Sequence, residues 1–166
     1  MKAFQHSGLL YAAEPLAGVA PGARPARAMQ SAAAETLLQS LQAHGPGGAV
    51  SKAHARGWVA AAAAVEGNVG IDLEFRQPGR DIAAIAQWLL DRPVDDAASA
   101  YRVFTYREAY FKALGDWPSS RLLRAVAEAR APDFQTPDGF NVRHEAVGGD
   151  FVLTLVWSAP CAARRL

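Results

Sequence analysis

The chain has 166 residues, one cysteine and a formal net charge of +1. This length predicts a single compact domain over residues 1–166 with a buried core, and the balanced charge argues against a protein that coats nucleic acid. The short apolar start, the absence of a membrane-length apolar run and an unpaired Cys161 together favour a soluble, cytoplasmic protein without membrane contact.

The N-terminal part of the sequence predicts a strand, a loop and a helix. A strand is expected around residues 8–12, and residues 18–27 are rich in Pro, Gly and Arg, as loops are. From residue 28 to 43, Leu37, Leu38 and Leu41 recur at helical spacing before a glycine-rich stop at residues 45–48. This stretch therefore predicts an amphipathic helix.

Two apolar runs follow, over residues 58–65 and 69–75. Only Glu66-Gly67-Asn68 separates them, which has the length and chemistry of a β-hairpin loop. The segment before the first run, residues 51–57, contains His54 and is expected to lie outside the strands. The sequence thus predicts a hairpin with His54 just ahead of it.

The rest of the chain predicts two helices and a second hairpin. Asp81 can cap a helix over residues 82–89, and a longer helix is expected from Asp95 or Asp96 to Leu114, with Gly115 as its C-cap. Residues 140–147 and 151–157 flank a Gly-Gly-Asp turn and alternate as strands do. The predicted fold class is α+β, with antiparallel sheet and packed helices.

Asp72 and Glu74 stand two residues apart in a strand, so both carboxylates project from one face. On spacing alone, solvated positions on an edge strand are the more common explanation. However, Gly70 permits close approach of a backbone or ligand, and two neighbouring carboxylates repel each other unless a cation lies between or beside them. The strand is therefore a candidate cation site.

Glu108 and Lys112 stand four residues apart on the long helix, one turn above each other. Such pairs are usually ordinary surface ion pairs. Here Tyr106, Tyr110 and Phe111 pack much of the helix circumference, which leaves a narrow polar stripe that calls for a partner. His54, flanked by Lys52 and Arg56, is either a loop histidine without a role or part of a local anion site.

In order and spacing, these segments resemble the 4′-phosphopantetheinyl transferase superfamily. The strand motif Gly-[Val/Ile]-Asp-[Ile/Leu]-Glu corresponds to residues 70–74, and the helix motif [Trp/Phe]-[Ser/Thr]-x-Lys-Glu-[Ala/Ser]-x-x-Lys corresponds to residues 104–112. Residues 51–55 resemble the Ser-x-Ser-His-Ser segment of the larger, pseudo-dimeric members that activate surfactin-type synthetases. Arg107 stands where most members have Lys, Ala55 replaces a common Ser, and the usual Gly-Lys-Pro stretch is absent.

The resemblance implies a transferase that moves 4′-phosphopantetheine from coenzyme A to a serine of an apo acyl or peptidyl carrier protein and releases 3′,5′-ADP. Asp72, Glu74 and Glu108 would bind Mg²⁺ with the pyrophosphate, and Glu108, or a water it holds, would be the base. Lys112 and Arg107 would contact the phosphates, and His54 the 3′-phosphate.

The resemblance also implies two unequal, pseudo-related halves, a shortened one over about residues 1–66 and one with the metal site over about 67–166. We expect a monomer with the site between the halves, and a carrier protein that meets Arg76, Arg80 or Arg92. Two alternatives stay open: a degenerate homologue that binds carrier protein or coenzyme A without turnover, and a metal-dependent phosphoesterase.

Overall fold

The computed structural model describes residues 4–6, 8–20, 22–44, 48–94 and 96–158, so Cys161 and most of the glycine-rich stop lie outside the described residues. The described residues form two four-stranded antiparallel sheets and four helices, which confirms the α+β class. The strands are β1 (Phe4–His6), β2 (Leu9–Pro15), β3 (Ala49–Ala55), β4 (Trp58–Ala64), β5 (Val69–Phe75), β6 (Asp133–Gln135), β7 (Phe140–Val147) and β8 (Phe151–Ser158). The helices are α1 (Arg27–Gln42), α2 (Ile82–Leu90), α3 (Ala97–Leu114) and α4 (Ser120–Glu128).

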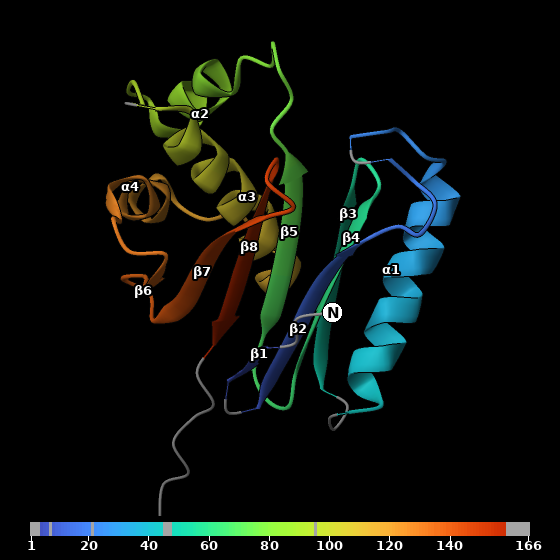
Figure 1. Cartoon of the computed structure of the whole chain (residues 1–166). Helices are drawn as coiled ribbons and strands as arrows, with labels where there is room; N and C mark the ends of the chain where they lie inside the picture. Colours follow the sequence, from blue (N-terminus) through green and yellow to red (C-terminus); the bar gives the residue numbers. More distant parts are fainter. Residues whose placement is uncertain (1–3, 7, 21, 45–47, 95, 159–166) are drawn as a thin grey trace, which may run out of the picture.

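The elements stack in four layers, with α1 on one outside, the two sheets face to face in the middle, and α2 to α4 on the other outside (Figure 1). The first sheet has the order β1-β2-β4-β3 and the second has the order β5-β8-β7-β6. A core of alanines and larger apolar residues fills the space between the sheets. No helix in the described part of the chain is both long and apolar enough to cross a membrane.

The two sheets share one chain connectivity. In the first, β2 leads through α1 into the β3–β4 hairpin and pairs antiparallel with β4. In the second, β5 leads through the helices into the β7–β8 hairpin and pairs antiparallel with β8. Each sheet is thus a strand, a helical connection and a hairpin whose second strand returns beside the first, with a short extra strand at one edge.

The hairpin predicted over residues 58–75 is wrong. Both strands exist, but β4 pairs with β2 and β3, whereas β5 pairs with β8 in the other sheet. The alanines of β4 are buried on both faces, so β5 packs over them rather than beside them. The Glu66-Gly67-Asn68 link crosses between layers and is held by Ser158, whose Oγ accepts from the Asn68 amide at 2.8 Å.

Four elements were not predicted: α4, β3 and the short strands β1 and β6. β3 lies where a loop around His54 was expected, and it joins β4 through Arg56-Gly57, both with positive φ. Two consecutive positive φ values form the tight turn that suits a two-residue hairpin loop. α4 begins at a cap in which the Ser119 Oγ accepts from the Leu122 amide.

The helices predicted from their caps are confirmed. The Asp81 carboxylate accepts from the Ala84 amide at the start of α2, and the Asp96 carboxylate accepts from the Ser99 amide at the start of α3. Gly115 ends α3 in the left-handed conformation, as a C-cap glycine does. The first helix begins one residue earlier than expected, and its three leucines are buried against the first sheet.

Candidate functional site

Strand β5 positions Asp72 and Glu74 toward α3. Val69, Ile71 and Leu73 are buried in the core between the sheets, so strand alternation turns the intervening residues to the helical side. Both carboxylates interact with basic groups on that side. The arrangement on one face is the one that the two-residue spacing predicted.

Gly70 lets helix α3 lie directly on this strand. A Cβ atom at residue 70 would overlap the carbonyl oxygen of Ala109 and lie 2.8 Å from the amide nitrogen of Ala113. Only glycine fits, because the obstructing atoms are helix backbone rather than movable side chains. This close approach brings Lys112, near the end of α3, within reach of Asp72.

Asp72 and Lys112 form the centre of the candidate site. The Lys112 Nζ donates to Asp72 Oδ1 at 2.8 Å and to the Ile71 carbonyl oxygen at 3.0 Å. Asp72 is only 7% exposed, and its Oδ2 has no hydrogen-bond partner among the described residues. Burial raises the pKa of this carboxyl, and the opposing effect of Lys112 does not cancel the rise.

Glu74 and Glu108 flank this pair. The Arg80 Nη1 donates to Glu74 Oε2 at 3.0 Å, and the Arg107 Nη1 donates to Glu108 Oε1 at 2.7 Å. Burial raises the pKa of Glu74, and the negative charges of Asp72 and Glu108 raise it further. The three carboxylates are therefore electrostatic neighbours, but each is neutralised by its own cation.

The three carboxylates do not form a closed metal cluster in this conformation. Within the described part of the chain, no three His, Cys, Asp or Glu side chains come together as a group that could hold a metal ion. Mg²⁺ is, however, bound through one or two carboxylates with water and phosphate oxygens completing the shell. The partnerless Asp72 Oδ2, with Glu74 and Glu108 as neighbours, is a donor set that suits such an ion.

Arg107 does not point away into open solvent. Its guanidinium lies 3.6 Å from the ring centre of Trp117, and Trp117 stacks on Phe111 with ring centres 4.2 Å apart. This stack, together with the Glu108 ion pair, fixes the orientation of Arg107 beside the carboxylates. The Trp117 contact was not predicted, since residue 117 lies beyond the end of the helix motif.

His54 lies on β3 with its ring toward α1. Its Nε2 is 3.3 Å from the Ser31 Oγ of α1. Burial lowers the pKa of His54, and the positive charges of Arg27, Lys112 and then Lys52 lower it further. A neutral imidazole among three cations marks a region of positive potential next to Lys112, in which an anion would be stabilised.

β3 and β5 are joined directly between the two sheets. The Ile71 amide donates to the Ser51 Oγ at 3.1 Å, which ties the His54 strand to the Asp72 strand. Lys52 pairs with Glu35 of α1, and Arg56 donates to Gln77. Of the three cations that act on His54, only Lys52 was expected beside it; Arg27 and Lys112 were not, and Arg56 contacts Gln77 and the Phe75 ring instead.

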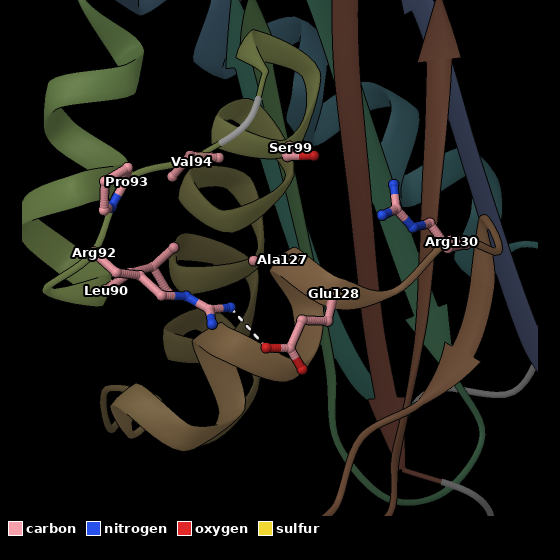
Figure 2. Close-up of a pocket in the computed structure, with 8 residues that line it drawn as sticks. All are labelled: Leu90, Arg92, Pro93, Val94, Ser99, Ala127, Glu128 and Arg130. Carbon is pink, nitrogen blue, oxygen red and sulfur yellow. Dashed lines mark hydrogen bonds and ion pairs between the residues drawn. The ribbon is translucent and has the colours of Figure 1, made fainter.

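A cavity of about 420 Å³ lies elsewhere, between the ends of α2, α3 and α4 (Figure 2). Its floor includes Leu90 and Ala127, and Arg92 crosses it to pair with Glu128 at 2.8 Å. None of the three carboxylates lines it. Because Arg92 and Glu128 pair with each other and the cavity lies away from the carboxylates, we do not assign it to the candidate site.

No family model matches this sequence, and a search of curated proteins finds no match either.

Proposed function

We propose that this chain is a 4′-phosphopantetheinyl transferase that converts an apo acyl or peptidyl carrier protein to its holo form. The observation that carries the proposal is the buried Asp72, with one oxygen held by Lys112 and the other without a partner. Glu74 and Glu108 lie within electrostatic reach of it. A hard cation and a phosphate are the ligands that such a mixed set of carboxylates and cations would take.

In this proposal, Asp72, Glu74 and Glu108 would hold Mg²⁺ with water and the pyrophosphate of coenzyme A. When bound, the ion would neutralise charge on the pyrophosphate. Glu74 and Glu108 would exchange Arg80 and Arg107 for the ion. The side chains of both ion pairs keep 25–30% of their surface exposed, so water can take the place of a lost partner during the exchange.

The reaction breaks one bond and forms one at the β-phosphorus of coenzyme A. The serine oxygen of the carrier protein attacks this phosphorus, and the bond to the 3′,5′-ADP oxygen breaks. Glu108, or a water it holds, takes the serine proton. Lys112 stabilises the negative charge that develops on the departing phosphate, and Arg107, released by Glu108, offers its guanidinium N–H groups to the phosphate oxygens.

The coenzyme A end of the site is assigned to the junction of α1, β3 and β5. His54 would donate a hydrogen bond to the 3′-phosphate, and Arg27 and Lys52 would supply positive charge there. This region meets the carboxylate region at Lys112, whose charge acts on both His54 and Asp72.

The shared connectivity of the two sheets supports two related halves in one chain. The first half ends with β4 and the second begins with β5, and the candidate site lies where β3 and β5 meet. A site built from both halves of one chain needs no second copy, so we propose a monomer.

A second candidate is a degenerate homologue that binds carrier protein or coenzyme A without turnover. It is favoured by one observation: each carboxylate is already neutralised by a cation of the same chain. Such a protein would bind coenzyme A but leave the carrier unmodified.

The test is incubation of the protein with coenzyme A, Mg²⁺ and a panel of apo carrier proteins, read by intact mass. We expect at least one carrier to gain the mass of one phosphopantetheine, and no gain when coenzyme A is omitted. No gain on any carrier, with coenzyme A binding retained by calorimetry, would replace the transferase by the degenerate homologue. No gain and no binding would reject both.

A further inference from the structure

Trp117 lies three residues beyond the end of α3 and outside the helix motif, and it is 45% exposed. Single apolar residues are common on protein surfaces, and exposure alone indicates no function. The contacts of Trp117, however, lead directly to a residue of the candidate site, because its ring lies against the guanidinium of Arg107. Trp117 is therefore connected to the phosphate-binding side of that site.

The end of α3 holds the Trp117 ring in a defined position. Gly115 ends the helix in the left-handed conformation, with a φ of 74°, and the Trp117 amide then donates to the Asp116 Oδ1 at 2.8 Å. The Trp117 ring stacks on Phe111, with 4.2 Å between ring centres and 19° between the planes. Phe111 and Arg107 stand four residues apart, so one face of α3 presents both of them to Trp117.

The contact between Trp117 and Arg107 uses the arginine that departs from the family motif. The central guanidinium carbon lies 3.6 Å from the centre of the Trp117 ring, which is van der Waals contact with the face of the ring. A guanidinium is planar and its N–H groups lie in the plane, so contact on its flat side leaves them able to donate. One of them donates to Glu108 Oε1 at 2.7 Å. The compact ammonium of a lysine could not stack in this way.

Arg107 is held by two contacts, and the proposed function removes one of them. In the described part of the chain, its guanidinium contacts the Glu108 carboxylate and the Trp117 ring. Once Glu108 turns to a metal ion, the Trp117 ring is the contact that still orients the guanidinium. An arginine that is not held in place loses rotamer freedom when it binds a phosphate, and this loss weakens binding.

We propose that Trp117 is a positioning residue, which keeps the Arg107 guanidinium directed at the pyrophosphate of coenzyme A after Glu108 has released it. This inference rests on the proposed function, since it assigns a partner to one of the phosphate-binding groups. Trp117 itself touches neither coenzyme A nor the carrier protein in this account. It acts through Arg107 alone, so its loss should matter only while the arginine is present.

The test is a double-mutant cycle on the affinity for coenzyme A, measured by calorimetry with Mg²⁺ on the full chain. Trp117→Leu keeps an apolar contact with Phe111 but removes the aromatic face, and it should weaken binding about three- to tenfold. Arg107→Gln removes the cation, and adding Trp117→Leu to it should weaken binding no further. Trp117→Tyr keeps an aromatic face and should retain most of the wild-type affinity.

A purely structural role of Trp117 gives a different pattern. If the ring only packs the end of α3, Trp117→Leu should weaken binding equally with and without Arg107, and that result would overturn the inference. Phe111→Leu, which removes the ring on which Trp117 stacks, repeats the comparison with an independent variant. Trp88→Leu changes an exposed tryptophan of α2 and is the matched control, which should leave the affinity unchanged.

Failure of this inference can be told apart from failure of the proposed function. A wild type that binds coenzyme A and modifies a carrier protein, together with a Trp117→Leu variant of equal affinity, would overturn the positioning role alone. A wild type that binds no coenzyme A would overturn the positioning role and the proposed function together.

Discussion

Replacing Asp72 with Asn should leave the fold as stable as the wild type, or more stable, at neutral pH while it removes function. Asp72 is buried, its Oδ2 has no partner in the described structure, and burial raises its pKa despite Lys112. An acid whose pKa is higher in the folded than in the unfolded state destabilises the fold when it is ionised. The ionised Asp72 carboxylate therefore lowers the stability of the folded chain.

The magnitude depends on what Lys112 does after the substitution. Breaking a buried ion pair costs about 3–5 kcal/mol when it leaves an uncompensated buried charge. The Lys112 side chain is 31% exposed, so its ammonium can hydrate, and the Asn oxygen can still accept from it. Removing the buried negative charge favours the fold, but the Asn Nδ2 takes the place of the partnerless Oδ2 as an unsatisfied donor, which offsets about 1–3 kcal/mol of that gain. We expect a net gain of 0 to about 1 kcal/mol, or up to about 2–4 °C in Tm for a chain of this size.

The difference in stability between the wild type and Asp72→Asn should change with pH in a defined direction. Below the unfolded pKa of about 4, both states hold the proton and Asp72 has no effect on stability. As the pH rises through the higher folded pKa, the wild type loses stability relative to Asp72→Asn. Thermal and urea unfolding from pH 5 to 8, without divalent cations, should show this difference growing with pH. A variant that is less stable than the wild type by about 3 kcal/mol at pH 7.5 would show that the ionised Asp72 stabilises the fold.

Two other predictions follow from the same geometry. Gly70→Ala forces a Cβ against the Ala109 carbonyl oxygen, so it should lower the free energy of unfolding by about 1–3 kcal/mol and reduce activity. Because the obstacle is a backbone atom, adding Ala109→Gly should restore neither the stability nor the activity. Unchanged thermal unfolding of Gly70→Ala would show that α3 is not seated on β5 as described. His54→Gln should raise the KM for coenzyme A several-fold with little change in the KM for the carrier protein, and equal changes in both would contradict the assigned role of His54.

The sequence predicted elements best where local chemistry marks their ends. The boundaries of α2 and α3 followed from Asp81, Asp96 and Gly115, whose capping contacts are local. The β7–β8 hairpin followed from its glycine turn. In each case the deciding contact joins residues that are close in the chain.

The pairing of β4 could not be predicted in the same way. A short link between two apolar strands is compatible with a hairpin and with a crossing between layers. The outcome depends on the alanines of β4, which are small enough to be buried against α1 on one face and against the second sheet on the other. That arrangement depends on contacts between residues that are far apart in the sequence.

In the candidate site, too, local sequence features were predictable and long-range side-chain contacts were not. The spacings predicted that Asp72 and Glu74 share one strand face and that Lys112 lies on a polar helix stripe, while only the resemblance implied that they belong to one site. Gly70 was expected to permit a close approach, and the structure shows that approach and the contact of Asp72 with Lys112. The arginine partners of Glu74 and Glu108 were not predicted, since they depend on side-chain orientation.

The central claim is that this carboxylate site transfers phosphopantetheine, and the rate of mass gain on an apo carrier protein tests it most directly. The measurement compares the wild type with Glu108→Gln and with Glu128→Gln, which removes an equivalent carboxylate, also paired with an arginine, from a distant helix end. We expect Glu128→Gln to match the wild type and Glu108→Gln to be slower by about 10²-fold or more. Equal rates for all three proteins would contradict the claim.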